Sequence, residues 1–309
     1  RLIGLSGDSI QFINGELFIN DEMVIKKKIK NSLIIRCGRL NLETNSYIET
    51  LPNGLEHLTV YKKRGSLLNT KKFIEFHGLS DAKIAHRQYY PTNGNWKLTL
   101  DNFHECYHCQ PAHPEYCQVH DKDYIVAYGA GSNTGPASEK FDNILVKWNK
   151  NVEKMGHLTG EYYEIEFNDY SRSAERTPLK EGMFTETKSG KPISKLMGKF
   201  TDYDSGYTSV GTSPFNSLLM CNDFATLFTF IPVSPLYTQV ELMWLVHKDA
   251  EEGRDYNLEE MKWMWDVTTI ADKRIIENNQ KGVLSDKYVP GPLSQMEKGL
   301  EKFKSWYLR

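Results

Sequence analysis

The chain has little that would tie it to a membrane, to nucleic acid or to an oxidising compartment. No apolar run approaches the roughly 20 residues that span a bilayer, and no signal-peptide pattern opens the sequence. The formal charge is only −2, so neither nucleic acid nor an anionic membrane is an expected partner. Five cysteines, an odd number without framework spacing, predict reduced thiols and a cytoplasmic setting.

What is present is ordinary globular composition, with 309 residues, 39% hydrophobic and 25% charged. This length allows one large domain or two of ordinary size. Residues 1–76 carry twelve Lys and Arg against eight Asp and Glu, whereas the remainder is net acidic. The change of charge and texture near Phe76 and His77 predicts a domain boundary there, between residues 1–76 and 77–309.

The first 76 residues have the pattern of short β-strands. Ile10–Ile13 and Glu16–Ile19 flank Asn14-Gly15, a strong signal for a tight hairpin. A second turn is expected at Pro52–Gly54, between two further strand-like runs. This segment therefore predicts a small β-rich unit.

This β-rich segment resembles part of the catalytic region of bacterial type I signal peptidases, in Arg1–Asp8 and again in Ile48–Gly54. That family uses a Ser nucleophile and a Lys general base. By the resemblance both would precede Arg1, and Ser6 stands where the family usually has Pro. Ser6 is better explained as a turn residue, so we expect no peptidase activity.

Two imidazoles, those of His108 and His113, stand close together in a stretch rich in carboxylates and amides. Helical spacing predicts a helix that begins near Leu98 or Asp101 and that Pro111 stops. Five residues of straight helix would splay the two imidazoles by roughly 140°. They can converge only if the helix ends between them, which predicts a site at a helix terminus.

A carboxylate from far along the chain could complete this pair. Asn257 and Glu260 form a capping box, and helical periodicity continues to Gln280 with Gly282 as the terminator. On that helix Asp272 falls on a mostly apolar face, where a carboxylate is costly unless it is paired or ligates a metal. Two histidines and one carboxylate are the ligands of mononuclear non-haem iron.

Spacing alone leaves other interpretations open. Cys106 and Cys109, with Cys117 and His120 nearby, could instead form a structural zinc site that includes His113. Histidines of this kind are also often plain surface or hydrogen-bonded residues. Iron and zinc are close to equally favoured on this ground, with the structural interpretation close behind.

A second resemblance favours iron. Residues 77–309 are similar to the catalytic domain of the large (α) subunit of Rieske-type non-haem iron oxygenases. The similarity follows Asn95–Leu98, Asp101–Pro114, Asp272–Gly282, Tyr288–Ser294 and Phe303–Tyr307. It implies an α+β fold of the helix-grip type, with a curved antiparallel sheet packed on long helices. Strands are expected at Phe224–Ile231 and Tyr237–Val246, where apolar and polar residues alternate in the second of the two.

The resemblance also implies the roles of individual residues. His108, His113 and Asp272 would bind Fe(2+). Glu105 takes the place of the acidic residue that bridges this iron to a Rieske cluster in a neighbouring subunit. Asn102 would lie near the metal. The implied partners are O2, a small-molecule substrate, an electron-donating reductase and further copies of the chain in a homotrimer.

The Rieske [2Fe-2S] cluster itself has no ligands in this sequence. It needs paired Cys-x-His and Cys-x2-His arrangements, whereas before residue 104 the chain has only Cys37 and three histidines, none at such spacing from it. The signal-peptidase-like segment takes the place of the cluster domain, as in a fused or rearranged gene. We therefore expect little or no turnover by this chain alone.

The substrate is suggested by Glu105–Cys109, which is most similar to relatives that act on quaternary ammonium compounds such as glycine betaine. Those enzymes hydroxylate an N-methyl group and release formaldehyde. Aromatic-ring hydroxylation is the alternative reaction. A non-catalytic fold that holds hydrophobic ligands is the alternative outside enzymes.

Overall fold

The computed structural model describes residues 10–13, 16–29, 34–37, 40–52, 54, 56–62, 68–105, 108–127, 136–164, 172–213, 215–293, 297, 300, 304 and 307–308. Contacts divide the chain into two compact units, Arg1–Leu67 and Leu68–Arg309. Helix α1 (Leu68–Phe76) thus groups with the second unit, although the sequence places the boundary after Phe76. The reason is Phe73, which is buried against Val210 and Met220 of the larger unit.

The smaller unit is antiparallel β structure. Its strands are β1 (Ile10–Ile13), β2 (Glu16–Ile19), β3 (Glu22–Met23), β4 (Ile25–Lys28), β5 (Ile34–Cys37), β6 (Leu40–Thr50) and β7 (Glu56–Lys62). Ile13 pairs with Glu16, as a two-residue hairpin requires, although Asn14 and Gly15 lie outside the described residues, as does Ser6. The turn expected at Pro52–Gly54 is present, because Gly54 has φ 82° and its N–H donates to Leu51 O at 2.8 Å.

The larger unit is built on a seven-stranded sheet in which every neighbouring pair is antiparallel. The strands are β8 (Ala82–Thr92), β9 (Gly160–Glu164), β10 (Arg172–Pro178), β11 (Gly206–Ser213), β12 (Asn216–Met220), β13 (Phe224–Ser234) and β14 (Tyr237–His247), in the order β8-β14-β13-β12-β11-β10-β9. The strands expected at Phe224–Ile231 and Tyr237–Val246 are confirmed as parts of β13 and β14.

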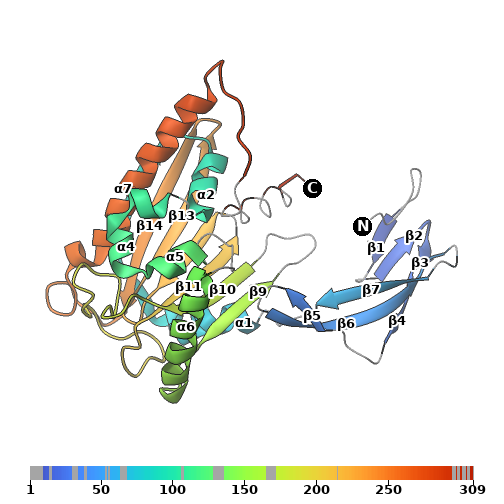
Figure 1. Cartoon of the computed structure of the whole chain (residues 1–309), viewed down its shortest axis with the longest axis horizontal. Coiled ribbons are helices and arrows are strands. Elements are labelled where there is room, and N and C mark those ends of the chain that lie inside the picture. The colour runs from blue at the N-terminus through green and yellow to red at the C-terminus, as the bar shows by residue number, and fades with distance from the viewer. Residues whose placement is uncertain are drawn as a thin grey trace. The chain divides into compact units, whose positions relative to one another are not determined.

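Helices pack on both faces of this sheet. They are α1, the 3-10 turn η1 (Leu79–Asp81), α2 (Trp96–His104), α3 (Cys109–Ala112), α4 (Pro114–Val119), α5 (Lys122–Ala127), α6 (Pro136–Lys154) and α7 (Leu258–Val283). Helix α7 contacts β8, α2 and α4, and Figure 1 shows it running along the seven-stranded sheet. Residues alternate in direction along each strand, so Tyr207 and Leu219 join the core under α4 and α7, whereas Val210 joins the core under α1.

Helix α7 begins as the capping box predicts. The side chain of Asn257 accepts a hydrogen bond from the backbone N–H of Glu260 at 3.0 Å. The helix continues past Gly282, because the N–H of Leu284 still donates to Gln280 O. Among the described residues, no helix is long and apolar enough to cross a membrane.

The helix expected to run from Leu98 to Pro111 is in fact two helices, so that prediction is wrong. α2 ends at His104, Glu105 is extended at φ −122° and ψ 137°, and α3 begins at Cys109. Pro111 does not stop a helix but occupies the first turn of α3, where backbone N–H groups have no intrahelical partner to lose.

Candidate metal centre

Helix ends bring the two histidines together. His108 is the N-cap of α3, and His113 is the residue between α3 and α4. Pro114 occupies the first turn of α4, so the chain turns sharply at His113, whose φ is −126° and ψ 72°. The convergence that a continuous helix would forbid is therefore achieved by the break at His113 together with the earlier one after His104.

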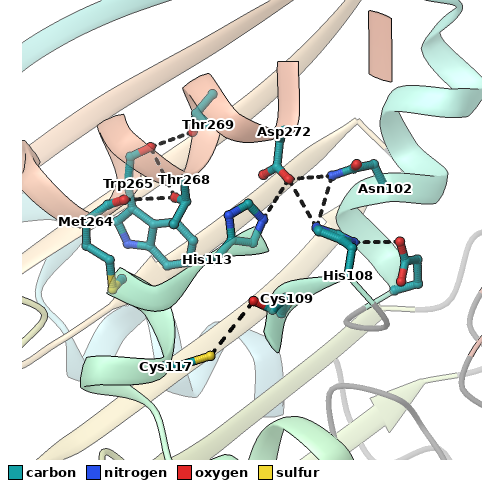
Figure 2. Close-up of polar contacts among 11 residues, drawn as sticks. Asn102, His108, Cys109, His113, Cys117, Met264, Trp265, Thr268, Thr269 and Asp272 are labelled. Atoms are coloured by element: carbon teal, nitrogen blue, oxygen red, sulfur yellow. Dashed lines mark hydrogen bonds and ion pairs between the residues drawn. The ribbon is translucent and has the colours of Figure 1, made fainter. Parts of the chain in front are cut away.

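Asp272 on α7 is the point at which these side chains meet. Its Oδ1 atom lies 3.1 Å from His108 Nε2 and 2.9 Å from His113 Nε2. Figure 2 shows both rings aimed at this one oxygen, with Asn102 of α2 reaching it from the other side. Among the described residues, one group of three His, Cys, Asp or Glu side chains has ligand atoms that all lie within 4.8 Å of one another. Its members are His108, His113 and Asp272.

The spacing of these atoms suits one metal ion. Two ligand atoms held about 2.1 Å from an ion at right angles to each other lie about 3 Å apart. Both measured N–O separations match that value. Two imidazoles and one carboxylate suit first-row transition metals, Fe(II) among them, and leave further coordination positions open. The residues present therefore fit a mononuclear metal centre.

Glu105 fixes the orientation of one of the two imidazoles. Its Oε1 atom lies 2.6 Å from His108 Nδ1. An ionised carboxylate can only accept, so Nδ1 carries the proton and Nε2 faces the site. Burial by itself would lower the pKa of His108, but hydrogen bonds to Asp272 and Glu105 raise it to about 10 in the metal-free protein. A metal would take the place of the proton on Nε2.

The surroundings of Asp272 likewise favour the form of its carboxyl group that binds a metal. Burial opposes its ionisation, yet the hydrogen bonds with His108 and His113 hold the pKa of Asp272 below the ordinary value. Asn102, itself buried, donates from Nδ2 to Asp272 Oδ1 at 2.8 Å and lies 3.5 Å from His108 Nε2. The amide therefore holds the carboxylate from the side of α2.

A pocket of about 150 Å³ opens beside the three residues. Rings from four different elements wall it, namely Phe103 of α2, Tyr116 of α4, Tyr207 of β11 and Trp265 of α7. Among its remaining lining residues are the hydroxyl groups of Ser209, Ser217 and Thr268. The candidate metal site thus faces a pocket whose lining combines four aromatic rings with several polar groups.

The sequence did not indicate most of this wall. Trp265 donates from Nε1 to Glu186 Oε2 at 3.0 Å, and Glu186 Oε1 lies 3.0 Å from His120 Nε2. The ring of His120 is also stacked on Tyr116 at 4.1 Å. Helical spacing from Asp272 back to Trp265 could have identified Trp265. Glu186 and Tyr207 carry no comparable signal.

The zinc interpretation finds no support among the described residues. Cys106 lies outside them, and His120 is paired with Glu186. Cys117 donates from Sγ to Cys109 O at 3.8 Å. No described cysteine belongs to the cluster around Asp272.

Comparison with known proteins gives the class of the chain. Residues 79–309 match the family described as the ring hydroxylating alpha subunit (catalytic domain). The chain belongs to this family, which confirms the resemblance drawn from His108, His113 and Asp272 and their surroundings. The seven-stranded antiparallel sheet with its helices is accordingly the fold of a Rieske oxygenase catalytic domain.

The chain is also similar to individual proteins. The glycine betaine monooxygenase oxygenase subunit of Chromohalobacter salexigens is 34% identical over 239 residues, which cover 74% of this chain and 50% of that protein. The subunit of the same name from Pseudomonas aeruginosa is 34% identical over 247 residues, covering 78% and 54%. The chain thus spans about half the length of these relatives. A solved quaternary ammonium Rieske monooxygenase has 16% identity and a TM-score of 0.48, covering 87% of this chain and 62% of that one.

Proposed function

We propose that His108, His113 and Asp272 bind one Fe(II) ion and that the domain hydroxylates a small organic substrate with O2. The preferred substrate is a quaternary ammonium compound such as glycine betaine, which would lose an N-methyl group as formaldehyde. The observation that carries the proposal is the convergence of the three ligand atoms on one point at an aromatic-walled pocket. Bound there, the iron would supply the O2 chemistry that the side chains cannot.

The chain's own residues have separable tasks in this proposal. His108 and His113 present Nε2 atoms, and Asp272 presents one oxygen. Glu105 orients His108, and in this proposal it also bridges the metal site to a Rieske cluster, as the family resemblance implies. Asn102 holds Asp272 through its amide, so it acts on one of the metal ligands.

Aromatic rings support a cationic substrate. Ring faces attract a quaternary ammonium group through their negative electrostatic potential, worth about 0.5–2 kcal/mol according to how dry the site is. Phe103, Tyr116, Tyr207 and Trp265 line the pocket. Glu186 accepts a hydrogen bond from the indole N–H of Trp265, which fixes the orientation of that ring. The names of the 34% identical relatives favour the same substrate class.

Electrons must come from a Rieske [2Fe-2S] cluster, and the residues before His104 contain no paired Cys-x-His and Cys-x2-His arrangement that could bind one. We propose that a cluster carried on other polypeptide, reduced by a reductase, supplies them at Glu105. A family-like homotrimer would place such a cluster beside the neighbouring subunit's iron site. The chain alone is then expected to turn over little.

Residues 1–76 are proposed to be a signal-peptidase-like segment joined to the oxygenase domain 77–309, without peptidase activity. The antiparallel strands of that segment and its sequence pattern support this proposal. For the larger domain we propose the helix-grip arrangement, because α7 packs on the same antiparallel sheet as α2. The five cysteines, an odd number without framework spacing, favour a cytoplasmic setting.

The substrate class can be tested by binding to the iron-loaded chain, measured by calorimetry. Glycine betaine is compared with 3,3-dimethylbutanoate, which has the same shape but carbon in place of the charged nitrogen. Loss of the cation–π term should weaken binding about 2- to 30-fold. Equal affinity of the two compounds would contradict the ammonium proposal. Formaldehyde release from glycine betaine, with a Rieske donor and reductase added, tests the reaction itself.

An aromatic-ring substrate is the second candidate. The same four rings could stack on a planar apolar molecule, and the matched family is described as ring hydroxylating. Tighter binding of a simple arene than of glycine betaine would favour this alternative. Tight binding by metal-free protein, unchanged in Asp272→Ala, would instead favour a ligand container without catalysis.

A further inference from the structure

A second, smaller cavity lies on the far side of Asp272, between α2, α7 and the sheet. Its volume is about 20 Å³, more than the roughly 10–15 Å³ that one water-sized molecule needs. The lining residues are Thr92, Thr99, Asn102, Phe103, Phe228, Phe230, Val240, Thr269, Asp272, Lys273 and Ile276.

The polar groups of this lining already have partners. The three threonine hydroxyls all donate to backbone carbonyls, Thr92 to Tyr90 O at 3.0 Å, Thr99 to Asn95 O at 3.3 Å and Thr269 to Trp265 O at 2.5 Å. With their hydroxyl protons engaged, these residues offer no free hydroxyl donor to the cavity. A buried water needs two to four polar partners, whereas cavities with apolar walls stay dry and take up gases.

The three remaining polar side chains, Asn102, Asp272 and Lys273, are engaged as well. Asn102 donates to Asp272 Oδ1, and Lys273 pairs with Glu277 one turn further along α7. The other walls are three phenylalanine rings, Val240 and Ile276. The chamber is therefore suited to a small uncharged molecule that requires no hydrogen bond.

The position of the cavity would place such a molecule close to the candidate metal site. Asn102, Phe103 and Asp272 line both this cavity and the larger pocket that faces His108 and His113. The two chambers are thus separated by single side chains. A molecule held in the small cavity would be next to the candidate metal site without occupying the room of the substrate.

We propose that this cavity is a binding site for a small apolar gas and that dioxygen is its occupant in the working enzyme. The gas site follows from the cavity's size and lining. Its assignment to dioxygen rests on the proposed oxygenase function. The site would hold dioxygen within reach of the metal centre while the larger pocket is filled by substrate.

Noble-gas binding tests the site directly. Crystals of the whole, metal-free chain are pressurised with krypton or xenon, and anomalous scattering locates the gas. We expect a peak between Val240, Phe230 and Thr99. A peak confined to the larger pocket, no peak, or an ordered water at this position would overturn the proposal.

Two substitutions sharpen the result. Val240→Leu adds a methylene group that fills the cavity and should abolish the peak, with Val240→Phe as a bulkier version. Thr99→Val keeps the shape of the wall and removes only a hydroxyl that already has its partner, so the peak should remain. Loss of the gas in Thr99→Val, or its retention in Val240→Leu, contradicts an apolar site.

The dioxygen assignment has a separate readout. In the iron-loaded protein, oxidation of Fe(II) by dissolved O2 is followed by electron paramagnetic resonance, with iron content measured in each sample. Val240→Leu should slow this oxidation at unchanged iron content, and an unchanged rate would refute the assignment. Failure of the wild-type chain to bind iron would refute the proposed function but leave the gas site standing.

Discussion

At the scale of single residues, the candidate metal centre depends on one oxygen atom and on the groups that contact it. Asp272 Oδ1 lies 2.8–3.1 Å from His108 Nε2, His113 Nε2 and Asn102 Nδ2. His108 Nδ1 donates to Glu105 Oε1 at 2.6 Å, whereas the buried Nδ1 of His113 has no partner among the described residues. The two imidazoles are therefore held unequally, and His108 depends on its neighbour.

This inequality predicts the effect of changing Glu105. Glu105→Ala removes the acceptor that orients His108 and should weaken metal binding about 10- to 100-fold. Glu105→Gln keeps a carbonyl acceptor at the same length and should lose less. Competition with a chromophoric chelator measures both, and Glu259→Ala at an exposed helix position is the control. Equal affinity of Glu105→Ala and wild type would contradict this role.

At the scale of elements, the approach of α7 to the loop before α2 sets the distance between Asp272 and Asn102. Glu277 accepts from the backbone N–H of Asn93 at 3.0 Å, and Gln280 accepts from that of Asn95 at 2.7 Å. Between them, Gly94 lies so close to α7 that an added Cβ would come within 2.5 Å of Ile276 Cγ2. The absence of a side chain at Gly94 permits this contact.

Gly94→Ala should push α7 and α2 apart. We expect a loss of about 1–3 kcal/mol in unfolding free energy, together with weaker metal binding, because Ile276 lies one turn from Asp272. Gly282→Ala is the matched control, since nothing lies within 4 Å of its Cβ position and alanine favours helix. Denaturant unfolding and metal titration measure the two effects. Identical behaviour of the two variants would show that the close contact is unimportant.

A buried ion pair joins the other elements of the larger unit. Arg176 of β10 donates from Nη2 to Asp204 Oδ1 and Oδ2 at 2.6 and 2.7 Å, and Trp148 of α6 donates to the backbone carbonyl of Asp204. His157 adds a 2.8 Å contact to the same carboxylate. Burial would raise the pKa of Asp204, but the charge of Arg176 and these hydrogen bonds hold it below 3.8.

The lowered pKa fixes the sign of a pH effect. A carboxyl group more acidic in the folded state stabilises the protein above its unfolded pKa, and this contribution is lost as pH falls through the folded value. Asp204→Asn leaves Arg176 buried without its charge partner and should cost about 3–5 kcal/mol at neutral pH. The difference from wild type in thermal unfolding should shrink below pH 3.8, the ordinary pKa of Asp. A difference independent of pH would contradict the ion pair's contribution.

At the scale of the whole molecule, features that depend on neighbouring residues in the sequence could be predicted. Features that depend on contacts between distant segments could not. Asn257 and Glu260 identified the start of α7, alternation from Thr238 to Val246 identified β14, and an acidic residue on an apolar helix face singled out Asp272. The break at Glu105 was missed because the stretch has helical spacing throughout. The extended backbone at Glu105 and the second helix that begins at Cys109 are visible only in the structure.

Most of the pocket wall could not be predicted from a sequence pattern, because it depends on contacts between distant segments of the chain. Tyr207 and Ser209 reach the site because β11 pairs with β12 in a register that sets Ser209 opposite Leu219. That register depends on the whole sheet. Glu186 lies in a segment without regular secondary structure, so its contact with Trp265 also follows from the tertiary fold.

The division into two units predicts that the metal site is independent of the first. All of its residues lie in Leu68–Arg309. A fragment beginning at Leu68 should therefore bind the metal with the affinity of the whole chain, whereas a fragment beginning at His77 lacks Phe73 and should be less stable. Metal titration and thermal unfolding of both fragments measure this. A large loss of affinity in the longer fragment would contradict the division.

The central claim is that His108, His113 and Asp272 hold iron, and metal content tests it most directly. The chain is purified without oxygen, with iron and zinc both offered, and analysed for each element beside His108→Ala and Asp272→Ala. We expect about one iron per chain in the wild type and little in either variant. Zinc in place of iron, or metal retained in both variants, would contradict the account.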